Sequence, residues 1–125
     1  MNKKCINLKG MMKAGPYSHA VEANGFIFLS GSVPVHPETG EPVVNSIKEA
    51  TARTLDNIKL ILDEAGSSLD KVIRVGVFLK EMSYFKEMNE VYATYFTSDQ
   101  PARTCVAVKE MPADFPIEIE VVALK

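Results

Sequence analysis

Residues 101–122 read PARTCVAVKEMPADFPIEIEVV, two alternating runs joined by a segment that contains two prolines. Alternation with a period of two is typical of β-strands, in which successive side chains point to opposite faces of a sheet. In the first run, Arg103 and Cys105 share one face. In the second run, Glu118 and Glu120 share one face, opposite the isoleucines. The pattern predicts two strands that each carry charge within an otherwise apolar run.

Burying an unpaired charge is costly, so charged residues within these strands need an explanation. Three explanations are open: the charges pair with each other, lie at a sheet edge that faces water, or face a ligand. Alternation also leaves open whether Glu118 or Glu120 would face a ligand, because both lie on the same side of their strand.

Length and composition favour one ordinary globular domain, residues 1–125. The chain is 46% hydrophobic and 24% charged, and its apolar runs are too short to span a membrane. No continuous apolar segment follows the N-terminal lysines, so we expect a cytoplasmic protein rather than a secreted one. With a formal charge of −2 and scattered basic residues, we expect no nucleic-acid or membrane partner.

Cysteine and histidine give no sign of metal or redox chemistry. Cys5 and Cys105 have neither Cys-x-x-Cys nor Cys/His spacing, and His19 and His36 have no partner at ligand spacing. We therefore expect two free thiols and no metal site. A cysteine within an apolar strand is expected to pack rather than to act as a nucleophile, so the Cys105 thiol is assigned no chemistry.

The N-terminal half predicts a hairpin followed by a surface excursion. Residues 19–23 and 26–30 flank Asn24-Gly25, a pair suited to a two-residue type I′ turn because both central positions need positive φ. Prolines and glycines then recur over residues 34–42, where neither a helix nor a central strand would tolerate them. This excursion is expected on the surface.

A first helix is expected from about residue 47 to Gly66. Ser46 and Glu49 have the spacing of a capping box, and apolar residues then recur at helical spacing through Ala65.

A strand and a second helix are expected next. Residues 69–80 alternate, with Ile73 predicted on the same face as Val75 and with Val72 on the other. Ser83 is expected to cap a helix whose apolar stripe ends near residue 96.

With a short first strand at residues 5–8, the predicted fold is α+β: a single mixed sheet with two helices packed on one face. Each helix has one apolar stripe to bury, which places both on the same face. The other face would expose apolar side chains in a monomer, so we expect homo-oligomerisation across it. Its candidate residues are Phe26, Phe28, Val72, Phe78 and Val106.

Five short motifs occur in a specific order over nearly the whole chain. They are GPYS at 15–18, SG at 30–31, NEVY at 89–92, PAR at 101–103 and IEIE at 117–120. Together they resemble the reactive intermediate deaminase A family (RidA), also called YjgF or liver perchloric-acid-soluble protein. The connection at residues 97–100 lacks the aromatic residue that many members carry before the proline, so the rim of the pocket is expected to differ.

The resemblance implies a chorismate-mutase-like fold and a homotrimer with a site at each subunit interface. It also implies cofactor-free hydrolysis of 2-enamino or 2-imino acids, such as 2-iminobutanoate and 2-iminopropanoate, to 2-keto acids and ammonia. By the same resemblance, Arg103 would hold the substrate carboxylate, and Glu118, rather than Glu120, would position or activate water. The implied substrate-binding residues, some from the neighbouring chain, are Tyr17, Ser30, Gly31, Asn89 and the Cys105 main chain.

The chemistry of imine hydrolysis suits these residue types. The planar guanidinium of arginine binds a carboxylate through two parallel hydrogen bonds and stays charged at any working pH. A carboxylate within reach of a water molecule can accept its proton and later return it, which typically contributes about 10²–10⁴-fold in rate.

Two other functions stay open. The same arginine-centred pocket would serve a non-catalytic module that binds small carboxylates such as keto acids. Ribonuclease or translation-inhibitor activity has also been attached to the family, and the acidic composition and absence of a basic stripe argue against it.

Overall fold

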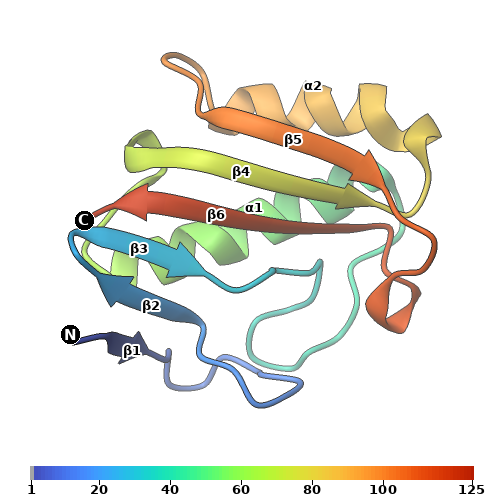
Figure 1. Ribbon diagram of the computed structural model, residues 1–125. Coiled ribbons are helices and arrows are strands. Elements are labelled where there is room, and N and C mark those ends of the chain that lie inside the picture. Colours follow the sequence, from blue (N-terminus) through green and yellow to red (C-terminus); the bar gives the residue numbers. More distant parts are fainter. Residues whose placement is uncertain (1) are drawn as a thin grey trace.

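The computed structural model describes residues 2–125, which form one mixed six-stranded sheet with two α-helices packed on one face (Figure 1). The strands are β1 (Lys4–Ile6), β2 (Ala20–Ala23), β3 (Phe26–Leu29), β4 (Val72–Leu79), β5 (Ala102–Ala107) and β6 (Ile117–Leu124). The helices are α1 (Ile47–Glu64) and α2 (Phe85–Tyr95), with short 3-10 turns at Leu69–Lys71, Met82–Tyr84 and Pro112–Asp114. This architecture confirms the predicted α+β class. None of the helices within residues 2–125 is both long enough and apolar enough to cross a membrane.

The strand order is β1-β2-β3-β6-β4-β5, so the C-terminal strand lies in the middle of the sheet. Only the β4–β5 pair is parallel, with α2 as its crossover, and β5 forms one edge. β6 pairs antiparallel with both β3 and β4. The two charged strands of the sequence are therefore separated by β4 rather than adjacent.

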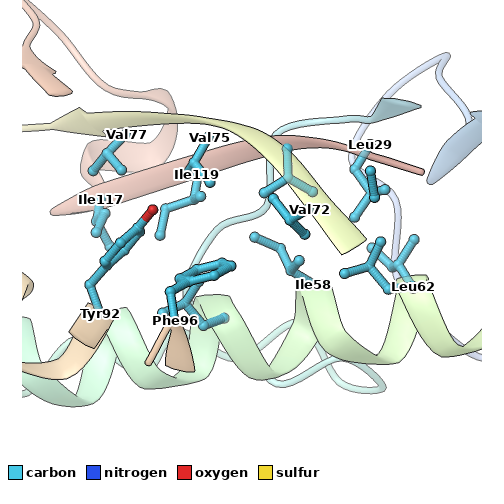
Figure 2. Packing of buried hydrophobic residues seen from close by; sticks show 14 of the residues in the cluster. Leu29, Ile58, Leu62, Val72, Val75, Val77, Tyr92, Phe96, Ile117 and Ile119 are labelled. Atoms are coloured by element: carbon cyan, nitrogen blue, oxygen red, sulfur yellow. The ribbon is translucent and has the colours of Figure 1, made fainter. Parts of the chain in front are cut away.

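The core lies between the helices and one face of the sheet. Figure 2 shows Ile58 and Leu62 of α1 near Leu29 of β3, and Tyr92 of α2 and Phe96, which directly follows α2, pointing toward the sheet. Fully burying one aliphatic side chain stabilises the fold by about 1.5–3 kcal/mol, so this layer dominates stability.

The predicted hairpin and first helix are confirmed in detail. Asn24 and Gly25 have φ values of 51° and 81°, as a type I′ turn requires. The Ser46 hydroxyl accepts a hydrogen bond of 3.1 Å from the Glu49 amide at the start of α1, and Gly66 has a φ of 78° just after its end.

The predicted cap of α2 is wrong. Ser83 lies inside the 3-10 turn Met82–Tyr84, and the residue before the helix is Tyr84, whose side chain makes no capping bond. The turn runs straight into the helix, and the Phe85 amide already bonds to the Met82 carbonyl. A side-chain cap is unnecessary where a preceding turn supplies acceptors for the first amides.

The predicted alternation of β4 is wrong at its start. The register shifts between Val72 and Arg74, as in a β-bulge, and residues 69–71 form a 3-10 turn instead of strand. A bulge adds one residue to one strand and so reverses which side chains face the core. Val72 is therefore buried, with 5% of its surface exposed, whereas Ile73 is 40% exposed. Val72 does not belong to the second sheet face.

The face of the sheet away from the helices is nonetheless apolar. We call it the open face and define it by Phe26, Phe28, Phe78, Val106 and Val122, which are exposed or half-buried. Part of it forms a hollow of about 400 Å³ that also includes Arg74, Thr104 and Glu120. Oligomerisation across this face stays a prediction.

Asn57 of α1 fixes the surface excursion, a role that the sequence did not reveal. Its buried side-chain amide donates hydrogen bonds to the carbonyls of Val35 (2.8 Å) and Val33 (3.4 Å), and its oxygen accepts one from Arg53 (3.2 Å). One side chain thus anchors the loop that follows β3.

Asn57→Ala is expected to lower the free energy of unfolding by about 2–3 kcal/mol, because the carbonyls lose a buried donor. Urea unfolding at one fixed protein concentration measures this. Arg53→Ala, which removes only the bond to the asparagine oxygen, is the matched control with a smaller expected loss. Equal stability of Asn57→Ala and wild type would show that the anchor is not needed.

Candidate functional site

Within one chain, Arg103 and Glu118 lie on opposite faces of the sheet. Arg103 lies opposite the core residue Val75, on the side of the helices, whereas Glu118 lies opposite Phe78, on the open face. Pairing of these two charges within one chain is thereby excluded. Three salt bridges occur within residues 2–125, and they join Lys48 to Glu90, Lys80 to Asp114 and Lys125 to Glu22.

Arg103 is held by α2. Its Nη1 donates a hydrogen bond of 2.7 Å to Asn89 Oδ1, and its Cζ lies 4.7 Å from the Tyr92 ring centroid and 5.7 Å from that of Phe85. Cation–π contact of this kind orients the guanidinium without using its donors. Of the five N–H donors, Asn89 occupies one among residues 2–125, so the fork is available for a carboxylate.

Local sequence explains this arrangement. Pro101 directly precedes β5. The parallel register of β5 with β4 then places Arg103 at the sheet edge, with its side chain on the face that α2 covers. Positions 85, 89 and 92 fall on one helix face, and the Arg103 side chain of β5 contacts the residues at all three positions. Phe85 and Tyr92 are not among the site residues predicted from the sequence, and their helical spacing relative to Asn89 is the signal that could have found them.

Arg103, Asn89 and Tyr92 border a hollow of about 350 Å³, which we call the arginine half-site. Its lining residues are Asn89, Tyr92, Ala93, Gln100, Pro101 and Arg103. The Tyr92 side chain is 6% exposed, and its buried hydroxyl has no hydrogen-bond partner within residues 2–125. Tyr92 therefore contacts Arg103 through its ring and not through its hydroxyl.

Cys105 lies on the same face as Arg103, two residues further along β5. Burial raises the pKa of the Cys105 thiol, with a smaller opposing effect of Arg103 on that pKa, so the thiol stays protonated at neutral pH. The outer edge of β5 has no neighbouring strand among residues 2–125, so alternate main-chain groups there are unpaired by the sheet. A role for the Cys105 main chain is compatible with this edge position.

Glu118 occupies a second hollow, of about 180 Å³, on the open face. Its walls are mainly apolar: Phe78, Val108, Met111 and Pro112, with Glu110 beside them. Burial, followed by repulsion from Glu120, raises the pKa of Glu118, whereas the Glu120 side chain is exposed. A carboxylate whose pKa is shifted toward neutral suits proton transfer, and this favours Glu118 over Glu120.

Gly31 lies beside Glu118, and Ser30 directly precedes Gly31 in the chain. The Ser32 and Ile119 main chains exchange two hydrogen bonds, of 2.7 and 3.0 Å, which hold this segment against β6. Ser30 donates its hydroxyl to the Ser18 carbonyl (2.7 Å), so that hydroxyl already has a structural partner. We call Gly31, Ser30 and Glu118, with Tyr17, the glutamate half-site.

Tyr17 lines a small hollow of about 60 Å³ with Ser30 and Gly31. Tyr17 is 42% exposed, and its hydroxyl accepts a hydrogen bond of 3.1 Å from the Ala14 amide. The seven predicted site residues thus divide into two groups. Arg103, Asn89 and Cys105 form one. In the other, Gly31 lies against Glu118 and also lines the hollow of Tyr17 and Ser30, which is separate from the hollow of Glu118.

His19 serves the structure of this region. It is buried, with Nδ1 accepting a hydrogen bond of 2.9 Å from the Leu8 amide and Nε2 within 3.3 Å of the Met12 carbonyl. His19 therefore connects residues 8–12 to the start of β2. No cluster of three or more His, Cys, Asp or Glu side chains suited to a metal ion occurs within residues 2–125.

Asn89→Ala is expected to lower kcat/KM for a carboxylate substrate about tenfold, because the bond to a charged partner contributes about 1.5–3 kcal/mol. Asn89→Asp should lower it further, since a carboxylate beside Arg103 competes with that of the substrate. Steady-state kinetics of the two variants tests this. Full activity of Asn89→Asp would mean that Arg103 does not bind substrate.

Residues 9–125 match the family model described as Endoribonuclease L-PSP. The chain is 50% identical to a RutC family protein of Pyrococcus abyssi over 111 residues, which cover 89% of this chain and 87% of the relative. Its structure is similar to that of YyfA from Yersinia pestis, of the conserved Rid protein family (TM-score 0.94, 36% identity, 99% of this chain and 100% of that one). It is also similar to E. coli TdcF with bound serine (TM-score 0.90, 34% identity, 98% of each chain). The chain therefore belongs to the YjgF/RidA family, as its ordered motifs predicted.

Proposed function

We propose that this protein is a cofactor-free hydrolytic deaminase that converts 2-enamino or 2-imino acids, such as 2-iminobutanoate and 2-iminopropanoate, to 2-keto acids and ammonia. One observation carries the proposal: the chain presents an oriented guanidinium fork in one hollow and a carboxylate of raised pKa in another. The first suits a substrate carboxylate and the second suits proton transfer to and from water.

The relative with bound serine supports the substrate class. TdcF holds a small α-amino acid on a fold that this chain shares at a TM-score of 0.90. A 2-imino acid has the same carboxylate beside a nitrogen-bearing carbon, so a similar pocket suits both.

In the proposed reaction, Arg103 holds the substrate carboxylate. Glu118 accepts a proton from water as the water oxygen bonds to the imine carbon, and passes that proton to the imine nitrogen. It then moves the hydroxyl proton to the same nitrogen, the C–N bond breaks, and ammonia and the 2-keto acid leave. Atoms balance with one water consumed, and no electrons are exchanged.

The proposal requires two chains for each site, because Arg103 and Glu118 lie on opposite faces of one sheet. We propose a homotrimer in which the arginine half-site of one subunit meets the glutamate half-site of the next. A head-to-tail contact closes into a ring when the rotation between subunits permits it, and the number three is taken from the family. The apolar open face supplies the contact surface.

The interface prediction has a direct test. Phe28→Asp, in the middle of the open face, is expected to give monomers and to abolish turnover, because it buries an unpaired charge in the contact. Leu60 is a similarly exposed apolar residue on α1, so Leu60→Asp is the matched control and should keep the trimer. Light scattering that returned monomers for the wild type at micromolar concentration would contradict the proposal.

The enzyme proposal itself is tested by an imine generated in situ. An amino-acid dehydratase or oxidase supplies the imine, and accelerated ammonia release on adding this protein supports deamination. Keto-acid-induced thermal shift without turnover would instead support a carboxylate-binding module. RNA cleavage that persists through further purification would favour the ribonuclease reading. We place the reaction in the cytoplasm, in keeping with the free thiols Cys5 and Cys105.

A further inference from the structure

We infer that Gly31 is a positioning residue, which keeps the Glu118 carboxylate at its place in the site by leaving a space that any other side chain would fill. The catalytic part of this inference rests on the proposed function. Its structural part does not.

The space at Gly31 is already occupied by Glu118. A Cβ added to Gly31 would lie 2.1 Å from Glu118 Oε2, 2.8 Å from Cδ and 3.1 Å from Cγ. Non-bonded heavy atoms prefer separations of about 3.5–4.0 Å, so the carboxylate would have to move by more than an ångström. Gly31 is absent from the residues with positive φ, so its backbone conformation suits other amino acids. The absence of a Cβ is therefore what the position requires.

The glycine segment is held too firmly to move instead. Ser32 bonds to Ile119 through both main-chain groups, and the Ser30 amide donates to the His19 carbonyl (3.1 Å). Because Ile119 directly follows Glu118, the bonds to β6 fix Gly31 relative to the strand that carries the carboxylate. A methyl group at position 31 would displace the Glu118 side chain.

Close approach of Gly31 also accounts for the half-burial of Glu118. The glycine covers one side of the carboxyl group, and the apolar hollow of Phe78, Met111 and Pro112 covers another. Displacing the carboxyl toward solvent would undo the desolvation that raises its pKa.

A second glycine on the same face provides a matched control. A Cβ on Gly76 would lie 3.2 Å from both Cγ and Oε1 of Glu120, a contact that a shift of a few tenths of an ångström relieves. Glu120 is exposed, so its side chain has room for that shift. Gly76→Ala should therefore change the titration of Glu118 far less than Gly31→Ala does.

The test combines Gly31→Ala with three residues at position 118. With Glu118 or Glu118→Gln, which have the same length, Gly31→Ala is expected to lower Tm by more than about 1 °C. With Glu118→Asp, one methylene shorter, the same change should lower Tm by less than about 1 °C. In Gly31→Ala alone, the side-chain carboxyl signal of Glu118 in ¹³C NMR should titrate closer to the ordinary glutamate pKa than in wild type.

Activity then tests the catalytic part. Misplacing a catalytic group by about 1 Å can cost about 10²-fold, so Gly31→Ala should lower kcat by that order while changing KM less. Equal Tm losses in the Glu118 and Glu118→Asp backgrounds, or an unchanged Glu118 titration, would overturn the inference. Absence of deaminase activity in the wild type would reject the proposed function alone, because the Tm and NMR results would still decide the role of Gly31.

Discussion

Glu118→Gln is expected to lower kcat by about 10²–10⁴-fold while keto-acid binding stays measurable, because an amide keeps the shape of the side chain but cannot accept a proton. The half-buried position of Glu118 and its raised pKa make it the carboxylate suited to proton transfer. Ammonia release from an imine formed in situ gives kcat, and thermal shift with a keto acid gives binding.

Glu120→Gln is the matched control, since Glu120 lies two residues away on the same face but is exposed. Its turnover should stay near that of wild type. If Glu120→Gln loses activity and Glu118→Gln retains it, the assignment of the working carboxylate is wrong.

Glu118 also predicts the pH dependence. As the base, it must be ionised, so kcat/KM should fall as pH drops through its raised pKa. Stability has the opposite pH dependence to activity. The native state holds the Glu118 proton more tightly than the unfolded state does, so ionisation of Glu118 destabilises the fold as pH rises. Glu118→Gln should therefore be more stable than wild type near neutral pH, and the difference should shrink below the ordinary glutamate pKa. Thermal unfolding of both proteins, near neutral pH and below the ordinary glutamate pKa, measures this difference in stability.

Arg103→Lys is expected to behave almost like Arg103→Ala, with kcat/KM at least about tenfold below wild type. The ammonium of lysine keeps the charge but loses the planar fork that stacks over Tyr92 and bonds to Asn89. Misplacement of the substrate carboxylate follows in both variants.

Folding should survive both changes at Arg103. The residue is half-buried on an edge strand and forms none of the salt bridges within residues 2–125. Circular dichroism and thermal unfolding give the comparison. Near-normal turnover of Arg103→Lys, or unfolding of Arg103→Ala, would make Arg103 a structural residue and would remove the case for a carboxylate-binding site.

Local chemistry in the sequence predicted the elements that have their own signals. Asn24-Gly25 specifies the hairpin because few residue pairs tolerate positive φ, and Ser46 specifies the start of α1 because its hydroxyl caps an amide. The bulge at Val72 and the uncapped start of α2 have no such residue signature. Both depend on how the segment fits the rest of the sheet, which sequence periodicity does not report.

The sequence suggested candidate site residues one by one but not how they are arranged in space. Alternation placed Arg103 and Glu118 on defined faces of their own strands, yet it could not relate those faces, because the relation depends on the register of both strands with β4. The contact between Gly31 and Glu118 was hidden for the same reason: a bridge between distant segments creates it.

Subunit mixing tests the central claim, a site formed by Arg103 of one chain and Glu118 of another. Arg103→Ala and Glu118→Gln, each nearly inactive alone, are denatured together in equal amounts and refolded. In a site formed between two chains, Arg103 is intact with a probability of one half, and so is Glu118. About a quarter of the sites, and of the wild-type activity, should therefore return. If both residues of a site come from one chain, every site carries one defect. Activity no higher than that of the separate variants would therefore contradict the account.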